Sequence, residues 1–205
     1  MASATGRGTA ADGRWECGVV IFHKTIFEGA SLIDMERHED ARGAFGRLFC
    51  AEEFRAQGLP DTFVQQNLSV SVRRGTIRGM HYQLEPHGEA KLVRCIRGAI
   101  ADIILDLRPE SPTYMRWASF TLSADNLKQL LVPSGFAHGF QTLADDTEVS
   151  YLVSHPYTPA AEQGVRWNDP AAAIEWPIAP TERTDKDRNW PDLDLVQPQA
   201  QQFSG

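Results

Sequence analysis

The chain has 205 residues, of which 42% are hydrophobic and 23% are charged, and its 20 basic and 27 acidic residues give a net charge of −7. This composition excludes a wholly disordered chain, and an acidic chain without a basic run is not expected to bind nucleic acid over a broad face. A few local Arg and Lys residues can still hold a small anionic ligand such as a phosphate.

The N-terminal residues 1–14 are small and polar and have no periodic pattern, which predicts a disordered tail. They contain no apolar core of a secretory signal, and no stretch of the sequence approaches the ~18 apolar residues of a membrane span. Cys17, Cys50 and Cys95 are an odd number of cysteines at no metal-ligand spacing, so we expect reduced thiols. These features predict a cytoplasmic protein that does not bind a membrane.

The first predicted regular element is a helix at residues 51–57, which ends before a glycine and a proline. Residues 63–72 then end in clean alternation of polar and apolar side chains, with Leu68, Val70 and Val72 on one face. A period of two is the pattern of a strand.

Short apolar runs separated by turn residues predict the remaining strands, at residues 91–96, 99–107, 116–122, 129–132, 139–143 and 148–153. Between the first two runs, Arg97 and Gly98 indicate the tight turn of a hairpin. Short strands at this spacing are typical of a sandwich or barrel. We therefore expect an all-β antiparallel jelly roll with a few short helices at its edges.

No repeat, linker or low-complexity block interrupts the chain between its ends, which predicts one domain over residues 15–180. Residues 181–205 are polar and are expected to form an extension with a short helix or an irregular strap. A small jelly roll leaves sheet edges that pairing between subunits would cover, so the sequence also favours a homodimer.

Residues 73–97 contain the most candidate catalytic groups. The alternation around His81 would direct it, with Gly79 and Gln83, into the interior of a barrel, although a lone histidine is more often a core residue with satisfied hydrogen bonds. Lys91 begins a strongly apolar strand, where a lysine is unusual, although a solvated strand end would also explain it.

Three later residues also have two interpretations. His138 lies between Gly135 and Gly139, which can bring a side chain to a barrel mouth, but a buried histidine bonded to a backbone carbonyl would show the same pattern. Tyr151 in mid-strand is also explained by a place in the core, and Asp169 in Asn-Asp-Pro by an ordinary turn. No one of these residues decides between structure and chemistry.

A set of motifs follows in one order along most of the chain: D-A-R-G at residues 40–43, F-V-Q-Q-N at 63–67, G-T-I-R-G-M-H-Y-Q at 75–83, K-L-V-R-C at 91–95, L-D-L-R-P-E-S-P-T at 105–113, P-S-G-F-A-H-G-F-Q-T-L at 133–143, R-W-N-D-P at 166–170 and I-E-W-P at 174–177. This ordered set resembles the dTDP-4-dehydrorhamnose 3,5-epimerase family of the cupin superfamily. The resemblance implies a cupin-type jelly roll and an isomerase that acts on a nucleotide-linked 4-keto-6-deoxyhexose, in deoxysugar or polysaccharide synthesis.

By position, the resemblance gives His81 the role of catalytic base and Asp169 that of the carboxylate that hydrogen-bonds it. Lys91 would lie near the C4 keto oxygen, and Tyr151 would be the acid on the opposite face of the sugar ring. The resemblance further implies substrate contacts from Arg42, Gln65, Asn67, Arg78, His138, Tyr157 and Arg166.

These residue types suit the reaction. The C–H bonds at C3 and C5 of a 4-keto sugar are weakly acidic, and histidine is the base best matched to neutral pH. A carboxylate would fix the tautomer of that histidine, Lys91 would stabilise the enolate oxygen, and arginines would bind the diphosphate. No metal or other cofactor is expected, because Lys91 can carry the enolate charge.

Two positions where the resemblance leads us to expect aromatic rings against the thymine hold Ala44 and Pro156. The sequence therefore leaves the nucleotide base open and predicts a weak preference for thymidine. It also leaves open whether C3, C5 or both are inverted. Two other classes remain as alternatives: a metal-dependent cupin, for which His81, Glu89 and His138 would contribute to a poor ligand set, and a non-catalytic sugar-nucleotide binding module.

Overall fold

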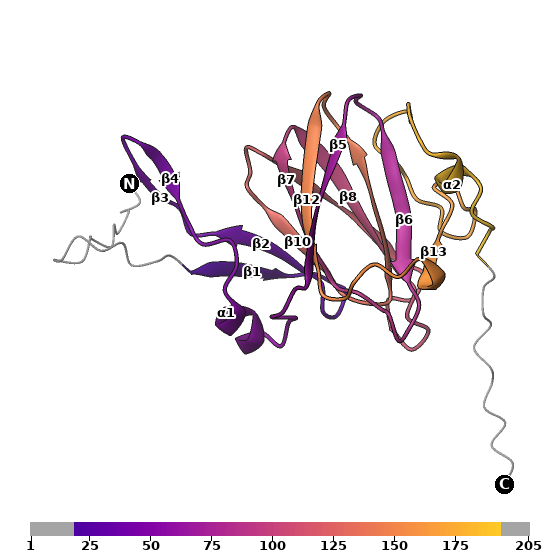
Figure 1. Cartoon of the computed structure of the whole chain (residues 1–205), viewed down its shortest axis with the longest axis horizontal. Coiled ribbons are helices and arrows are strands. Elements are labelled where there is room, and N and C mark those ends of the chain that lie inside the picture. Colours follow the sequence, from indigo (N-terminus) through magenta and orange to yellow (C-terminus); the bar gives the residue numbers. More distant parts are fainter. Residues whose placement is uncertain (1–18, 194–205) are drawn as a thin grey trace, which may run out of the picture.

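Two antiparallel β-sheets packed face to face form the body of the molecule, with short helices outside them (Figure 1). The computed structural model describes residues 19–193, so the tail predicted at residues 1–14 lies outside the described residues. The predicted all-β, jelly-roll class is confirmed.

One sheet has six strands, in the order β1 (Val20–Lys24), β2 (Ser31–Met35), β10 (Gln129–Val132), β7 (Lys91–Arg97), β12 (Thr147–Val153) and β5 (Gln65–Ser71). The other has five, in the order β13 (Glu162–Gly164), β6 (Ile77–Gln83), β11 (Phe136–Thr142), β8 (Ala99–Asp106) and β9 (Trp117–Ser123). A separate hairpin consists of β3 (His38–Asp40) and β4 (Gly43–Phe45). The helical elements are α1 (Ala51–Ala56), the 3-10 turn η1 (Pro159–Ala161) and α2 (Asp185–Arg188).

The main core lies between the two sheets, because the strands that face each other are apolar on their inner sides. Val93 of β7, Ile104 of β8 and Phe140 of β11 all belong to this core cluster. β11, the central strand of the five-stranded sheet, is buried along its whole length. The sheets therefore provide firm walls for side chains that project between them.

The predicted hairpin at Arg97 and Gly98 is wrong. β7 pairs with β10 and β12, whereas β8 pairs with β9 and β11 in the other sheet. The turn carries the chain across the core, because in a sandwich successive strands can belong to different sheets. β7 thus pairs only with strands that are distant in the sequence, whereas β8 pairs with the next strand, β9, and with β11.

Helix α1 covers part of the outer face of the six-stranded sheet through one aromatic residue. Phe54 is fully buried, and its ring meets those of Phe22 and Phe49 edge to face, with centroids 5.1 and 4.7 Å away. The hairpin of β3 and β4 extends from the β1–β2 end of this sheet, away from the two packed sheets (Figure 1).

β5 is an edge strand whose two faces have different surroundings. Leu68, Val70 and Val72 share one face, as predicted, and their side chains are exposed. The alternate residues Gln65 and Asn67 line a pocket inside the molecule. The polar side of this strand is therefore the inner one, and its apolar side is the outer one.

The chain after β13 returns over the outer face of the five-stranded sheet. Val165 and Ile174 pack there against Met80 and Ile103 in a second apolar cluster. The described part of the polar extension, residues 181–193, follows this layer and brings α2 beside β6 (Figure 1). The predicted boundary at residue 180 stays a prediction.

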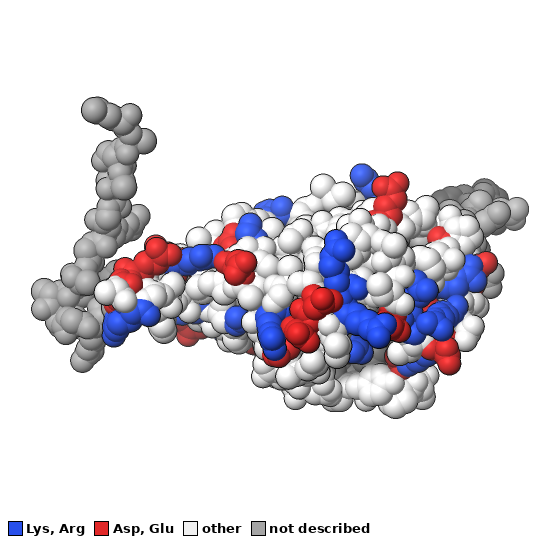
Figure 2. Space-filling view, turned by 90° about the horizontal axis from the view of Figure 1, so that it is seen from above, with Lys and Arg blue, Asp and Glu red and all other residues white. Residues whose placement is uncertain are grey.

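The face of the molecule shown in Figure 2 has basic and acidic side chains side by side. None of the helices within residues 19–193 is long and apolar enough to span a membrane. The cytoplasmic location expected from the sequence stays a prediction.

Asp106 at the end of β8 is fully buried and accepts hydrogen bonds from Arg108, Ser111 and Thr113. Burial alone would raise the pKa of Asp106, but these hydrogen bonds outweigh it and lower the pKa to about 2. Because the pKa of this group is lower in the folded protein than its ordinary value of 3.8, the carboxylate stabilises the fold above about pH 4. This contribution is lost as the pH falls towards 2.

We expect protonation of Asp106 to lower the free energy of unfolding by about 2 kcal/mol between about pH 5 and pH 2. Urea unfolding of the natural protein and of Asp106→Asn over this pH range measures the contribution. The variant should start less stable and lose less on acidification. The same pH dependence in both proteins would contradict the prediction.

Candidate active site

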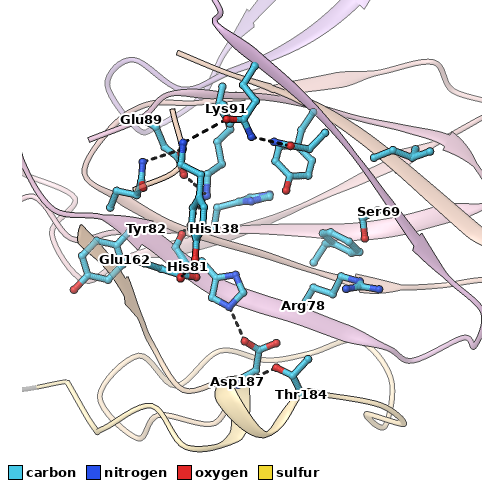
Figure 3. Close-up of a pocket in the computed structure, with 18 of the residues that line it drawn as sticks. Ser69, Arg78, His81, Tyr82, Glu89, Lys91, His138, Glu162, Thr184 and Asp187 are labelled. Atoms are coloured by element: carbon cyan, nitrogen blue, oxygen red, sulfur yellow. Dashed lines mark hydrogen bonds and ion pairs between the residues drawn. The ribbon is translucent and has the colours of Figure 1, made fainter. Parts of the chain in front are cut away.

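A pocket of about 570 Å³ lies between the two sheets, with β5, β7 and β12 on one wall and β6 and β11 on the other (Figure 3). Residues from β13 and from the chain around α2 complete it. Its polar lining consists of Gln65, Asn67, Ser69, Arg78, His81, Tyr82, Gln83, Glu89, Lys91, His138, Tyr151, Tyr157, Glu162, Thr184, Lys186 and Asp187. Eight of the eleven predicted site residues thus line one pocket.

Both Arg78 and His81 of β6 line the pocket, although strict alternation would place them on opposite faces of the strand. The register of β6 against β11 shifts between these two residues, which is the signature of a bulge. Gly79 lies at the bulge with φ of +112°, and a Cβ there would be 2.6 Å from Cα of Gly139. Only glycine fits this position, and the bulge is what directs both side chains into the pocket.

His81 forms a hydrogen bond with Asp187, with 2.6 Å between Nε2 and Oδ1 (Figure 3). Asp187 lies in α2 and is 2% exposed. Burial alone would raise the pKa of Asp187, but the hydrogen bond and charge of His81 outweigh it and lower the pKa, so this group stays a carboxylate. With one ring nitrogen held by Asp187, the other nitrogen of the imidazole can accept a proton.

The prediction that Asp169 is the partner of His81 is wrong. Asp169 is 1% exposed, and its two oxygens accept hydrogen bonds from the backbone N–H groups of Ala171, Ala172 and Leu193. The carboxylate therefore holds the backbone of the C-terminal segment in place and does not meet the imidazole.

Lys91 projects into the pocket from the start of β7 and has a carboxylate partner. Its Nζ lies 3.1 Å from Oε1 of Glu89 and donates a hydrogen bond of 3.4 Å to the carbonyl of His81 (Figure 3). Gln83 in turn donates to the other oxygen of Glu89. The ammonium thus has a fixed place beside the backbone of His81.

Tyr151 of β12 lies on the wall opposite His81, since β12 and β6 belong to different sheets. Its ring packs against the main core, as the core interpretation of the sequence expected, and it also lines the pocket. Burial raises the pKa of Tyr151, and the charge of Glu89 raises it further. The phenol therefore keeps its proton through the neutral range and can donate it.

A second pair of histidine and carboxylate lies in the same pocket. His138 of β11 is paired with His81 in the sheet register, and its Nε2 lies 2.8 Å from Oδ1 of the fully buried Asp102. His138 is thus buried, but its partner is a side chain and not the backbone carbonyl that the sequence suggested as an alternative.

The remaining polar lining includes an amide pair and an ionic group. Gln65 donates a hydrogen bond to Asn67, and its carbonyl oxygen accepts one from the backbone of Tyr157. Glu162 forms an ion pair with Lys186 and accepts a hydrogen bond from the hydroxyl of Tyr157. These groups provide donors, acceptors and one exposed aromatic ring, that of Tyr157, for a polar ligand.

Two predicted substrate contacts do not lie in the pocket of their own chain. Arg42 is on the projecting hairpin, 2.6 Å from Asp40, and Arg166 forms an ion pair with Asp192. Neither arginine lines the pocket described above. The prediction that they contact substrate is therefore not met within one chain.

Sequence reasoning missed four charged residues of this site, namely Asp102, Glu162, Lys186 and Asp187, and considered Glu89 only as a metal ligand. Asp102 had a signal, because a carboxylate in the middle of an apolar strand must be paired. Asp187 and Lys186 had none, because they lie in a polar segment with the composition of a solvated tail.

The arrangement as a whole suits removal and return of a proton beside a carbonyl group. The histidine paired with a carboxylate is a base, and the protonated phenol on the facing wall is an acid. The fixed ammonium can stabilise negative charge on an oxygen. Within residues 19–193, no three or more His, Cys, Asp or Glu side chains are grouped so as to hold a metal ion.

Comparisons with known proteins agree with this chemistry. The sequence profile described as dTDP-4-dehydrorhamnose 3,5-epimerase matches residues 24–194. A protein of that name from Sinorhizobium fredii is 43% identical over 182 residues, which cover 88% of this chain and 93% of the relative.

Solved structures give the same result. The dTDP-4-dehydrorhamnose 3,5-epimerase from Bacillus anthracis, with TDP and PPi bound, is 43% identical and has a TM-score of 0.82, covering 85% of this chain and 100% of its own. A 3'-monoepimerase from Streptomyces bikiniensis, as a histidine-to-asparagine and tyrosine-to-phenylalanine double mutant in complex with dTDP, is 36% identical with a TM-score of 0.77. That alignment covers 83% of this chain and 86% of the other.

Proposed function

This chain belongs to the dTDP-4-dehydrorhamnose 3,5-epimerase family, and on that premise we propose that it inverts C3 and C5 of a dTDP-linked 4-keto-6-deoxyhexose. The observation that carries the proposal is the placement of His81 and Tyr151 on opposite walls of one pocket that also contains Lys91. An inversion needs one proton to leave a carbon and another to arrive from the opposite side, and this placement allows both. The enzyme is an isomerase.

The chain's own side chains account for each proton and charge. His81 takes the proton from C3 or C5, and Asp187 stabilises the imidazolium that forms. The electron pair of the broken C–H bond moves into an enolate, whose oxygen is stabilised by the ammonium of Lys91. Tyr151 gives its proton to the carbon from the other side and recovers one from solvent, while His81 releases its proton to solvent.

The assignment of acid and base is supported by the Streptomyces bikiniensis 3'-monoepimerase. The histidine and tyrosine exchanged in that protein are separated by the same number of residues as His81 and Tyr151 are here. We infer that the two pairs are counterparts, because they are the same two residue types at the same separation in chains of the same fold.

A thymidine nucleotide is the favoured carrier of the sugar, since the structures of both similar epimerases contain TDP or dTDP. Tyr157 is exposed at the pocket, and its ring offers a surface on which a base can stack. The weak thymidine preference expected from Ala44 and Pro156 stays a prediction. Calorimetric titration with TDP and UDP decides between the two: specific recognition of thymine predicts a preference of about tenfold or more for TDP, whereas the weak preference predicts similar affinities for both nucleotides.

A second candidate is an epimerase that inverts one centre only. It is favoured by the similarity to the 3'-monoepimerase, which has the same residue types at the same separation. The two candidates share a base and an acid, so they differ in which carbons reach His81.

Proton NMR of dTDP-4-keto-6-deoxyglucose with the enzyme in deuterium oxide tests both candidates. We expect the signals at C3 and C5 to exchange with solvent and the sugar to change configuration at both carbons. Exchange at one carbon alone would establish the second candidate. No exchange at either carbon would refute both.

We further propose a homodimer in which the hairpin of β3 and β4 reaches the pocket of the partner. The hairpin projects away from its own barrel and holds Arg42 outside its own pocket (Figure 1). The apolar outer side of the edge strand β5, with Leu68 and Val70, is exposed together with Val72 just after it, and a second subunit would cover this surface. In such a dimer Arg42 would bind the diphosphate of the partner's substrate, as an arginine fork does.

Mixing two inactive variants tests this arrangement. Arg42→Ala and His81→Asn subunits, combined after dissociation, would form one site that has both a natural His81 and a natural Arg42, so activity should return. If Arg42 serves its own chain, no mixed site is complete and activity stays absent. Light scattering on the natural protein must give the mass of a dimer.

Asp187→Asn is expected to lower the rate of C–H exchange by about a hundredfold or more, because an amide cannot stabilise the imidazolium and can hold the wrong tautomer. Asp169→Asn should instead lower the free energy of unfolding by about 1–3 kcal/mol, because it disturbs buried hydrogen bonds to the backbone. Exchange is measured by NMR and stability by urea unfolding. An equal loss of exchange in both variants, without loss of stability, would contradict the assignment of Asp187 as the partner of His81.

A further inference from the structure

Asp187 reaches His81 from a segment that cannot hold itself in place. We call residues 184–193 the strap. Its helix α2 has only four residues, and an isolated helix of that length is unstable in water. Thr184 accepts a hydrogen bond from the backbone N–H of Asp187, but this bond lies within the strap. The position of the Asp187 carboxylate therefore depends on contacts between the strap and the barrel.

The indole of Trp190 makes one of these contacts. It occupies the space that a side chain would fill at Gly164, since a Cβ there would collide with the Cε2 and Nε1 atoms of the indole. Gly164 is the residue that pairs with His81 in the register of β13 against β6. The indole thus lies against the backbone directly beside the catalytic imidazole.

The same ring contacts two charged or titratable groups of the site. The centroids of the Trp190 and His81 rings are 6.4 Å apart, in an edge-to-face arrangement. The ammonium of Lys186 lies 5.6 Å from the centroid of the Trp190 ring and forms an ion pair with Glu162. Trp190 therefore lies between the strap and β13 at the point where Asp187 meets His81.

The end of the strap has a second anchor. The backbone N–H of Leu193 donates a 2.7 Å hydrogen bond to the buried carboxylate of Asp169. Asp187, Trp190 and Leu193 follow one another at three-residue intervals, so Trp190 lies midway between this anchor and the carboxylate that meets His81. Between Asp187 and Leu193 lie the five residues 188–192, of which all except Trp190 are exposed.

We propose that Trp190 is a positioning residue for epimerisation, which fills the space over Gly164 and thereby sets Asp187 against His81. The inference rests on the proposed function, because it concerns the same pair of residues. Trp190 does not belong to the described lining of the pocket, so it acts through Asp187 and not on the substrate. Its indole N–H has no hydrogen-bond partner among the described residues, so the shape of the ring and not its polarity is what matters.

Three single substitutions test the proposal. Trp190→Ala should lower the rate of C–H exchange by about ten- to a hundredfold, since a small misplacement of a catalytic group has effects of this size. The dissociation constant for TDP should change by less than about threefold, because the nucleotide contacts remain. Trp190→Phe retains a flat ring and should restore most of the rate. Trp117→Ala is the matched control, because it removes an indole from β9, which β11 and β8 separate from the β6 strand of His81 in the sheet.

Double substitutions separate positioning from a general loss of stability. Gly164→Ala should reproduce the loss of Trp190→Ala in the natural protein, because the new methyl group displaces the ring. In a protein that already has Trp190→Ala, it should cost little more. Likewise, Trp190→Ala should cost little in a protein that already has Asp187→Asn. If the fold losses in exchange rate of the two single variants multiply in full in both double variants, the proposal is overturned.

A readout without substrate distinguishes failure of this inference from failure of the proposed function. The ring proton that His81 shares with Asp187 should give a low-field proton NMR signal, identified by its loss in Asp187→Asn. We expect this signal in the natural protein and in Trp190→Phe, and its broadening or loss in Trp190→Ala. If the natural protein has the signal but exchanges no proton of the sugar nucleotide, the proposed function fails and the positioning role is judged by the signal alone. A Trp190→Ala protein that keeps the signal overturns the positioning role.

Discussion

Replacement of His81 by asparagine is expected to lower deuterium exchange at C3 and C5 of the sugar by about a thousandfold or more. Removal of a general base costs on the order of 10²–10⁴ in rate, and His81 is the base for both carbons in the proposed mechanism. Asparagine is of similar size and can still bond to Asp187, so the fold and the binding of TDP should remain. Proton NMR in deuterium oxide measures the exchange, and circular dichroism and calorimetry check the fold and binding.

His87→Asn is the matched control, because His87 packs against His155, with ring centroids 5.2 Å apart, and does not line the pocket described here. Its exchange rate should stay close to that of the natural protein. Near-natural exchange by a folded His81→Asn protein would mean that another group removes the proton. His138 would then be the first group to test, because its pairing with Asp102 gives it the same chemistry.

The strands that surround the site could be predicted because apolar residues occupy their buried positions. β10 has the bounds that the sequence predicts, and β7 and β12 differ from the prediction by one residue. Five strands were not predicted, namely β1, β2, β3, β4 and β13. β3, β4 and β13 have only three residues each, and β1 at the sheet edge is largely exposed, so no regular alternation marks them. The pairing of β7 and β8 with different sheets could not be predicted, because a turn at Arg97 and Gly98 is compatible with either arrangement.

The site was predictable to the extent that its residues interrupt an apolar pattern. His81 and Lys91 stand in strands where a charge or an imidazole is unusual, and the structure places both in the pocket. Strict alternation would have excluded Arg78, because the bulge at Gly79 arises from close packing with a distant strand. Asp187 could not be distinguished from Asp169 locally, because each is an aspartate in a polar segment and only the path of the chain decides which one meets His81.

Tyr151→Phe is expected to separate proton exchange from inversion. The substitution removes one hydroxyl from a ring that packs against the core, so the fold should not change. His81 can still take a proton from the sugar, and the enolate can receive a proton again on the same face. We therefore expect net inversion to fall by about a hundredfold or more, as for loss of a general acid, while exchange at the position facing His81 falls by less than about tenfold.

One NMR experiment measures both the rate of inversion and the rate of proton exchange, and the difference between them is specific to the role of Tyr151 as the acid. Burial keeps the phenol of Tyr151 protonated, so the natural enzyme has a proton available on that wall, and the phenylalanine variant has none. Tyr114→Phe removes a hydroxyl outside the described pocket lining and should leave both rates unchanged. If inversion and exchange fall together in Tyr151→Phe, the hydroxyl acts on formation of the enolate and not on its reprotonation. If neither falls, Tyr151 is only a core residue at the pocket wall, and the proton for the opposite face comes from another group or from water.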